Sequence, residues 1–187
     1  MPFAARFALA LSIVVAVSPA FAARRAVHKA APAPAVEQPT LLGVSKAWTA
    51  YQANSMDGKV CYALSKPTDV LPKKGARDPI YVIISVWPGR NVKDELQIVP
   101  GYQYKEGEPV FAQVGNRKIE FFSRNDPTSG AAWVKDVADE DAMVRAMRSG
   151  STLTVTGTSK KGTRTTDTYS LSGIATALSR AHDACGK

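Results

Sequence analysis

The chain has 187 residues and a formal net charge of +8 at pH 7, from 24 lysines and arginines against 16 acidic residues. This length allows one ordinary domain with a real hydrophobic core. Two cysteines cannot form a zinc site alone, and the histidines lie far apart at His28 and His182, so a zinc-binding module is excluded. The surplus of positive charge favours acidic partners without identifying one.

The first 22 residues predict a secretory signal peptide with cleavage after Ala22. A charged start precedes an apolar core from Phe7 to Val17, and residues 20–22 form a small-x-small cleavage signal. The core is shorter than the roughly 20 residues that span a bilayer. We therefore expect a periplasmic or secreted protein.

Residues 23–40 are rich in alanine and proline, with basic side chains at Arg24, Arg25 and Lys29. Such a segment buries too little apolar surface to offset the entropy of ordering it, so we predict a flexible linker. Its charge suits peripheral association with anionic lipid or polysaccharide, and a solvated spacer is the alternative. A single domain is predicted to follow, over residues 41–187.

Strands dominate the first half of that domain. Residues 48–54 and 59–65 flank Asp57-Gly58, which predicts an antiparallel hairpin. Residues 79–87 are apolar on both alternating faces, as in a central strand covered on both sides. Between these elements, residues 66–79 contain three prolines and several basic side chains, which predict a long surface loop.

The second half continues with predicted strands over residues 95–104 and 110–123, the latter with a turn at Gly115-Asn116. A short apolar strand is predicted over residues 131–134. Near the carboxyl end, strands on either side of the Lys160-Lys161-Gly162 turn complete an antiparallel sandwich or barrel with small helices as cover.

Two helices are predicted. Asp139 is the expected cap of the first, in which Met143, Val144 and Met147 share one apolar face. The second begins near Ser172 and presents apolar side chains at helical spacing. These side chains are Ile174, Ala177, Leu178 and Ala181.

The two cysteines of the chain, Cys61 and Cys185, are most simply explained by one disulfide, because exported proteins meet an oxidising compartment. Free thiols and an intermolecular bridge remain as alternatives. An intramolecular bridge would close nearly the whole domain into one loop and contribute about 4 to 5 kcal/mol on the chain-entropy account.

Segments along the whole domain resemble the invasion-associated locus B (IalB) family. They include VCYALSKP, RDPIYVIIS, PGYQYKEG, AAWVKD and ALSRAHDAC, and the most specific is MRSGSTLTVTGTSKKGTRTTDTYSLSGIATAL. The resemblance implies a small exported bacterial protein with an immunoglobulin-like antiparallel β-sandwich and no established catalytic residues or cofactor. The family name implies an association with host-cell invasion.

Asp167 is the acid that the strand pattern places on an inner face, together with Thr165, Tyr169 and Leu171. A buried carboxylate needs hydrogen-bond donors or a cation, so we predict a structural tie. Ligand binding and general acid or base catalysis are the alternatives. Catalysis would need a companion group, for which the sequence offers only Glu120, Asp78 or His182, none at a motif spacing.

Two basic clusters are the candidate binding residues. They are Lys73, Lys74 and Arg77 on the predicted long loop, and Lys160, Lys161 and Arg164 around the hairpin turn. Both can contact an anionic envelope or host-surface component or an acidic protein face, whereas the plain alternative is that they keep the loops soluble. Nucleic acid is not expected, because export and the lack of a recognisable module argue against it.

The sequence therefore favours an exported, non-enzymatic binding protein of the cell envelope, without a metal or cofactor. The competing hypotheses are a small periplasmic hydrolase that uses Asp167 and an envelope assembly accessory that uses an exposed strand edge. The identity of the ligand and the oligomeric state do not follow from the sequence.

Overall fold

A single antiparallel β-sheet forms most of the domain. The computed structural model describes residues 38–186, so the predicted signal peptide and nearly all of the predicted linker lie outside the described residues. Within that range, eleven strands pair in the order β1-β2-β3-β5-β6-β9-β8-β7-β10-β11-β4, and every pair is antiparallel.

The bounds of the elements follow in chain order. The strands are β1 (Thr40–Ser45), β2 (Trp48–Ser55), β3 (Gly58–Ser65), β4 (Asp69–Leu71), β5 (Tyr81–Trp87), β6 (Val92–Val99), β7 (Val110–Val114), β8 (Arg117–Asn125), β9 (Gly130–Val134), β10 (Thr152–Thr158) and β11 (Arg164–Ser170). The helices are the short 3-10 turn η1 (Pro88–Arg90), α1 (Val137–Ser149) and α2 (Ile174–Cys185).

The predicted hairpins form with the expected turns. Strands β2 and β3 pair from Trp48 opposite Ser65 to Ser55 opposite Gly58. Strand β5 lies between β3 and β6, and its inward side chains are fully buried, which explains its apolar sequence. The turn at Gly115-Asn116 joins β7 to β8, as predicted.

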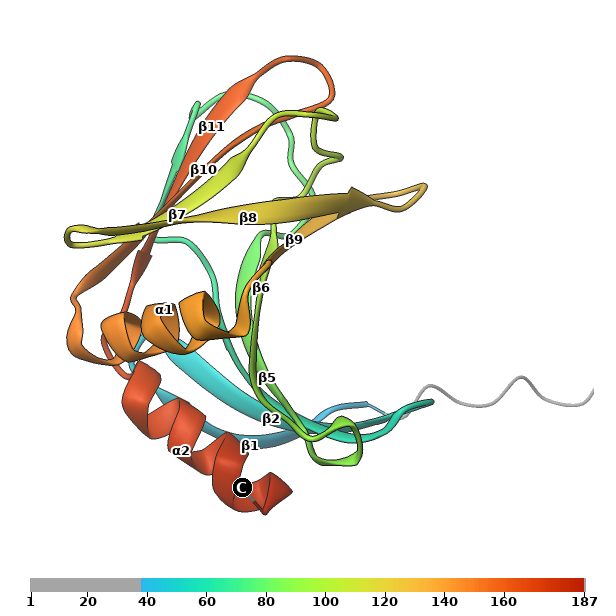
Figure 1. Ribbon diagram of the computed structural model, residues 1–187, viewed down its shortest axis with the longest axis vertical. Helices are drawn as coiled ribbons and strands as arrows, with labels where there is room; N and C mark the ends of the chain where they lie inside the picture. Colours follow the sequence, from blue (N-terminus) through green and yellow to red (C-terminus); the bar gives the residue numbers. More distant parts are fainter. Residues whose placement is uncertain (1–37, 187) are drawn as a thin grey trace, which may run out of the picture. The chain divides into compact units, whose positions relative to one another are not determined.

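The sheet is strongly bent, and both helices lie on one side of it (Figure 1). One hydrophobic core joins residues from distant strands, including Trp48 of β2 and Leu153 of β10. Helix α1 buries its predicted apolar face, and α2 buries Ile174 and Leu178 against the β1–β3 side. This sandwich-like, mainly antiparallel fold with a C-terminal helix confirms the predicted fold class. No helix among residues 38–186 is long and apolar enough to cross a membrane.

The start of α1 differs from the prediction, whereas α2 begins close to the predicted Ser172. The cap of α1 is Asp136, whose side chain accepts a hydrogen bond from the Ala138 N–H at 2.8 Å, so the predicted cap Asp139 was wrong and lies in the first turn. Helix α2 begins after Gly173, which has φ of +97°. A Cβ at Gly173 would lie 1.9 Å from the Ser45 carbonyl oxygen, so this close approach to β1 requires glycine.

Two strands were not predicted. Strand β1 begins at Thr40, inside the predicted linker, and its register shifts between Leu41 and Gly43. Strand β4 lies inside the predicted long loop and pairs with β11 at the edge of the sheet, with Val70 opposite Asp167. Neither strand is long or strongly alternating, so only their pairing partners reveal them.

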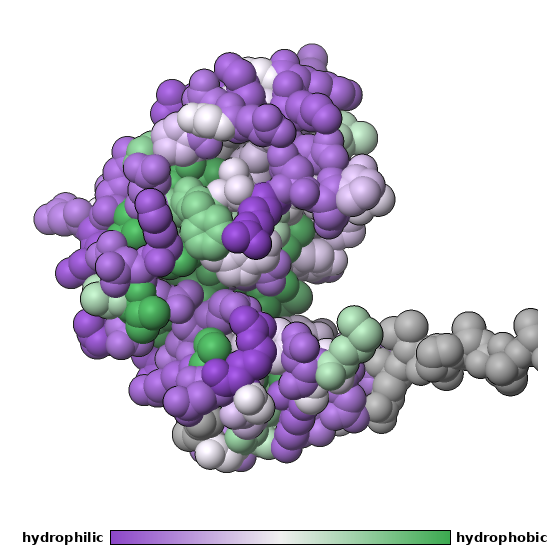
Figure 2. Space-filling model, turned by 45° about the vertical axis from the view of Figure 1, so that its right-hand side comes forward, coloured by the Kyte–Doolittle hydropathy of each residue, from purple (hydrophilic) through white to green (hydrophobic). Residues whose placement is uncertain are grey.

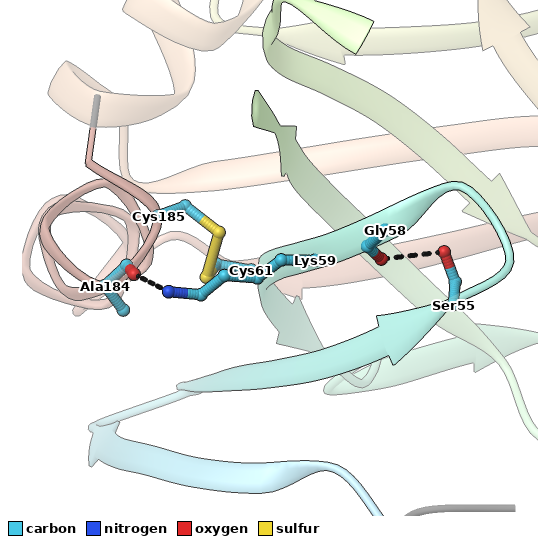
Figure 3. Close-up of a disulfide and its surroundings, with 6 residues drawn as sticks. All are labelled: Ser55, Gly58, Lys59, Cys61, Ala184 and Cys185. Atoms are coloured by element: carbon cyan, nitrogen blue, oxygen red, sulfur yellow. Dashed lines mark hydrogen bonds between the residues drawn. A yellow bond between two sulfur atoms is a disulfide. The ribbon is translucent and has the colours of Figure 1, made fainter. Parts of the chain in front are cut away.

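The disulfide joins Cys61 of β3 to Cys185 at the end of α2, with the two Cα atoms 5.9 Å apart (Figure 3). This confirms the predicted pairing. The Lys59 ammonium donates a hydrogen bond to the Ala184 carbonyl beside the bridge (Figure 3). The two cysteines pack with Val86 and Ala181 in a small apolar cluster. The bridge therefore fixes the last helix to β3, the third strand from one edge of the sheet.

Candidate binding pocket on the loops

Four connections meet at one end of the sheet and enclose a pocket of about 600 Å³. They are the β4–β5 loop, the β6–β7 loop, the β8–β9 turn and the β10–β11 turn. We call this the basic pocket. Hydrophilic residues dominate the upper end of the domain, where the β10–β11 turn lies (Figures 1 and 2).

Lysines from both predicted basic clusters line the basic pocket. Lys74 comes from the β4–β5 loop, and Lys160 and Lys161 come from the β10–β11 turn, more than 80 residues further along the chain. Lys160 Nζ is 3.3 Å from the side-chain oxygen of Gln103, which also lines the pocket. The fold thus brings together positive charges that the sequence places far apart.

Of the other three members of the two clusters, only Arg77 also lines the pocket. Lys73 forms an exposed ion pair with Asp69 and does not line the pocket. Arg164 is exposed and also lies outside the pocket lining. Arg77 was predicted on a surface loop, but its side chain is only 13% exposed because it turns inward to meet Asp167. The lysines therefore supply the accessible positive charge of the pocket.

Beneath the pocket, Arg77 and Asp167 form a bidentate ion pair. Arg77 Nη1 donates to Asp167 Oδ1 at 2.6 Å, and Nη2 donates to Oδ2 at 2.7 Å. Arg77 Nε also donates to the Pro100 carbonyl at 2.9 Å. Burial lowers the pKa of Arg77, but the hydrogen bond and charge of Asp167 outweigh it and raise this pKa above its ordinary value. One guanidinium thus connects β11, the β4–β5 loop and the β6–β7 loop.

Tyr102 lines the pocket next to Arg77. The Arg77 guanidinium carbon is 4.9 Å from the centroid of the Tyr102 ring. The Tyr102 hydroxyl is 2.6 Å from the hydroxyl of buried Thr165. Burial raises the pKa of Tyr102, although the Thr165 hydrogen bond and the charge of Arg77 oppose this, so Tyr102 is neutral at physiological pH.

The candidate catalytic companions of Asp167 do not form hydrogen bonds with it in the described part of the chain. His182 Nε2 instead lies 2.7 Å from Asp94 Oδ1, and the backbone N–H of Asp78 donates to the Gly101 carbonyl. Glu120 is an exposed residue of β8. The Asp167 side chain is 2% exposed, and both of its oxygens accept from Arg77. This is the geometry expected of a structural tie.

Among residues 38–186, no group of three or more His, Cys, Asp or Glu side chains could hold a metal ion. The polar groups of the basic pocket are ammonium, hydroxyl and amide groups and the paired guanidinium of Arg77, which can bind an anion that also bears hydroxyls.

A second concavity, of about 510 Å³, was not anticipated from the sequence. We call it the aromatic groove. Its rings come from Trp87 at the end of β5, Phe122 of β8 and Trp133 of β9. The Phe122 and Trp133 rings stack across the strand pair, with centroids 5.8 Å apart and planes 28° apart. No local pattern in the sequence indicates this groove, because Phe122 and Trp133 lie on consecutive strands but Trp87 comes from β5, much earlier in the chain.

The fold and the basic pocket define a class of disulfide-closed β-sandwich domain that presents charged loops at one end. The chain belongs to the family described as Invasion associated locus B (IalB) protein, whose model matches residues 48–182.

One similar solved structure is described as the crystal structure of invasion associated protein b from Bartonella henselae. It has a TM-score of 0.56 and 17% sequence identity, and the match covers 81% of this chain and 100% of that chain. At this identity the likeness shows the fold alone. No curated protein matches the chain.

Proposed function

We propose that this is an exported, non-catalytic binding protein of the bacterial cell envelope, which holds an anionic component in the basic pocket. The convergence of Lys74, Lys160 and Lys161 on one concave site is the observation that carries the proposal. Lysines that served only to keep separate loops soluble would have no reason to face a common pocket.

The chemistry of the pocket suits phosphate or carboxylate groups carried by a hydroxyl-bearing partner. Three ammonium groups supply charge-assisted hydrogen bonds, and Thr128 and Ser159 add hydroxyls. The positive charge of Arg77 is neutralised by Asp167, so this residue serves to position the loops. Because the lysines lie at a solvent-exposed rim, salt will weaken their attraction for an anion.

Export is supported by the disulfide and by membership of the family. The name of the similar Bartonella henselae protein associates that protein with invasion. A host surface is one setting in which this protein would contact an anionic partner. In this proposal the predicted signal peptide directs export and is cleaved after Ala22.

The absence of catalysis is supported by the state of Asp167. A general acid or base must present a carboxyl oxygen to a substrate, whereas both oxygens of Asp167 accept hydrogen bonds from Arg77. The hydrolase alternative would require that ion pair to open before each reaction. A binding function leaves it closed and uses it to hold the pocket loops in place.

The test uses protein produced from the full chain and purified after export, with co-sedimentation on phosphatidylglycerol vesicles and on lipopolysaccharide aggregates in separate arms. A Lys74→Gln, Lys160→Gln, Lys161→Gln variant is expected to lose about tenfold in affinity for at least one probe, and its binding is expected to depend less on salt. The arm that responds identifies which envelope anion is bound.

The matched control replaces three exposed lysines outside the pocket, Lys46, Lys66 and Lys135, with glutamine. It changes the net charge equally, so it is expected to retain most of the binding. Equal losses in the two variants would mean that general charge, and not the pocket, attracts the partner. Binding that neither variant weakens, or no binding to either probe, would overturn the proposal.

A further inference from the structure

The aromatic groove lies apart from the basic pocket and has a different character. Two arginines, Arg90 and Arg124, and two carboxyl side chains, Glu95 and Glu140, surround its rings. Glu95 and Glu140 offset much of the positive charge of the two arginines, although burial raises the pKa of Glu140 to about 7, whereas none of the described residues that line the basic pocket has a carboxyl side chain. A groove with this balance has little electrostatic preference for an anion.

The rings of the groove are held in fixed positions. Trp87 Nε1 donates to Glu95 Oε2 at 3.1 Å, and the Arg90 guanidinium carbon is 5.2 Å from the Trp87 ring centroid. The Arg124 guanidinium carbon is 5.6 Å from the Phe122 ring centroid. These contacts hold the rings in place and put an arginine over one face of Trp87 and of Phe122, while Phe122 stays 39% exposed.

Hydrogen-bonding groups lie directly beside the rings. Gln97 is the register partner of Trp133 across the β6–β9 pair, and both residues line the groove. Arg90 lies 3.6 Å from Glu95 and is 45% exposed, which leaves N–H groups available to a ligand. The groove thus alternates flat apolar faces with both donors and acceptors.

We infer that the aromatic groove binds a pyranose oligosaccharide of the β-1,4-linked type. Such a sugar has flat C–H faces that stack on aromatic rings and a rim of hydroxyl groups that both donate and accept hydrogen bonds. The groove offers both kinds of partner in the same place. A lipid chain is a poor fit, because it would contact charged side chains along the groove. A nucleic acid is also a poor fit, because its phosphates would lie near two carboxyl groups without a surplus of cations.

The inference does not depend on the basic pocket. No residue lines both concavities, although the β8–β9 hairpin contributes to each, with Thr128 at its turn and Trp133 on β9. If binding is not observed at one site, the proposal for the other site therefore still stands.

Tryptophan fluorescence provides a direct test in the full chain after export. The chain has three tryptophans, and Trp48 is fully buried, so acrylamide quenching reports mainly on Trp87 and Trp133. Chitotetraose, the β-1,4-linked tetramer of N-acetylglucosamine, is expected at about 10 mM to reduce the acrylamide quenching of this emission. This concentration is high enough to detect a Kd in the millimolar range. No protection of the wild-type protein would overturn the inference, and this result needs no variant.

Variants then locate the sugar. Trp133→Ala is expected to weaken binding about tenfold, and Trp133→Phe, which keeps a ring, is expected to restore most of the affinity. Gln97→Ala is expected to weaken binding severalfold while all the rings stay in place.

The matched control is Tyr62→Ala. It breaks the other stacked cross-strand pair, Tyr51 and Tyr62, whose centroids are 5.4 Å apart and which lies outside the groove. Equal losses in Tyr62→Ala and Trp133→Ala would overturn the inference, as would protection by phosphatidylcholine vesicles but not by the sugar.

Discussion

The two ends of the domain are held together by different chemistry. Where α2 covers the β1–β3 side, a disulfide and apolar side chains fix the helix to the sheet. Beneath the basic pocket, a buried ion pair joins a loop to β11, and buried tyrosines surround it. The disulfide end thus supplies stability, whereas at the pocket end buried polar side chains hold the binding loops in one arrangement.

The largest expected effect is loss of the disulfide. The bridge joins residues 124 positions apart, so opening it gives the unfolded chain much more freedom. We expect a Cys61→Ser, Cys185→Ser variant to lose about 4 to 5 kcal/mol of unfolding free energy, measured by denaturant titration. A loss below about 1 kcal/mol would contradict the account of this end of the domain.

The ion pair ranks second. Asp167→Ala or Arg77→Met leaves one charge buried without its partner, which is expected to lower the unfolding free energy by about 3 to 4 kcal/mol. The double variant Arg77→Met, Asp167→Leu is expected to recover much of this loss, because no buried charge remains. Denaturant titration of all three variants forms the test. A double variant that loses the sum of the single losses would show that the charges are not coupled.

Between the two ends, Glu140 of α1 accepts a hydrogen bond from the Leu96 N–H at 2.7 Å. Burial raises the pKa of Glu140 to about 7 from an ordinary 4.5, against the lowering effect of that hydrogen bond. The folded state therefore binds this proton more tightly than the unfolded state, and its contribution to stability falls as pH rises from about 4.5 to about 7.

Replacing Glu140 with glutamine keeps an acceptor for the Leu96 N–H and removes the titration. Relative to the wild type, Glu140→Gln is expected to gain on the order of 1 kcal/mol as pH rises through this range, allowing for solvent screening. Unfolding curves measured at pH 4 to 8 in parallel give the difference between the two proteins. A difference that does not change with pH would contradict the raised pKa.

The smallest expected effect concerns buried hydroxyls at the pocket end. Among the described residues, the hydroxyls of Tyr104 and Tyr169 are buried without a hydrogen-bond partner. Removing an unpaired hydroxyl relieves a desolvation cost, so Tyr169→Phe is expected to raise stability by about 0.5 to 1 kcal/mol. Thermal unfolding is the measurement. A clear loss of stability would mean that this hydroxyl has a partner, such as an ordered buried water.

The disulfide end of the fold was predictable from local patterns. Alternation in β2 and β3, helical spacing in α2 and a single pair of cysteines each point to the observed arrangement. Strand β4 was missed because three residues between prolines carry no periodicity. The cap at Asp136 was missed because Asp139, Glu140 and Asp141 follow it in the first turns of α1 and offer competing acids.

The pocket end was only partly predictable. Alternation in β11 placed Asp167 on a buried face, but its partner lies 90 residues earlier on a loop, where sequence spacing carries no information. For the same reason the sequence separated the basic residues into two clusters without indicating that Lys74 and Lys160 line one pocket. The aromatic groove is lined by residues of β5, η1, β6, β8, β9 and α1, and the sequence did not indicate it.

The most direct test of the basic pocket as the binding site is hydrogen–deuterium exchange of the exported protein with and without the envelope anion that it binds, phosphatidylglycerol vesicles or lipopolysaccharide. The account predicts slower exchange in the segments that enclose the pocket, residues 72–77, 102–103, 127–128 and 159–163. Exchange in β1 should not change. Protection confined to β1, or spread evenly over the exposed lysines, would contradict the central claim.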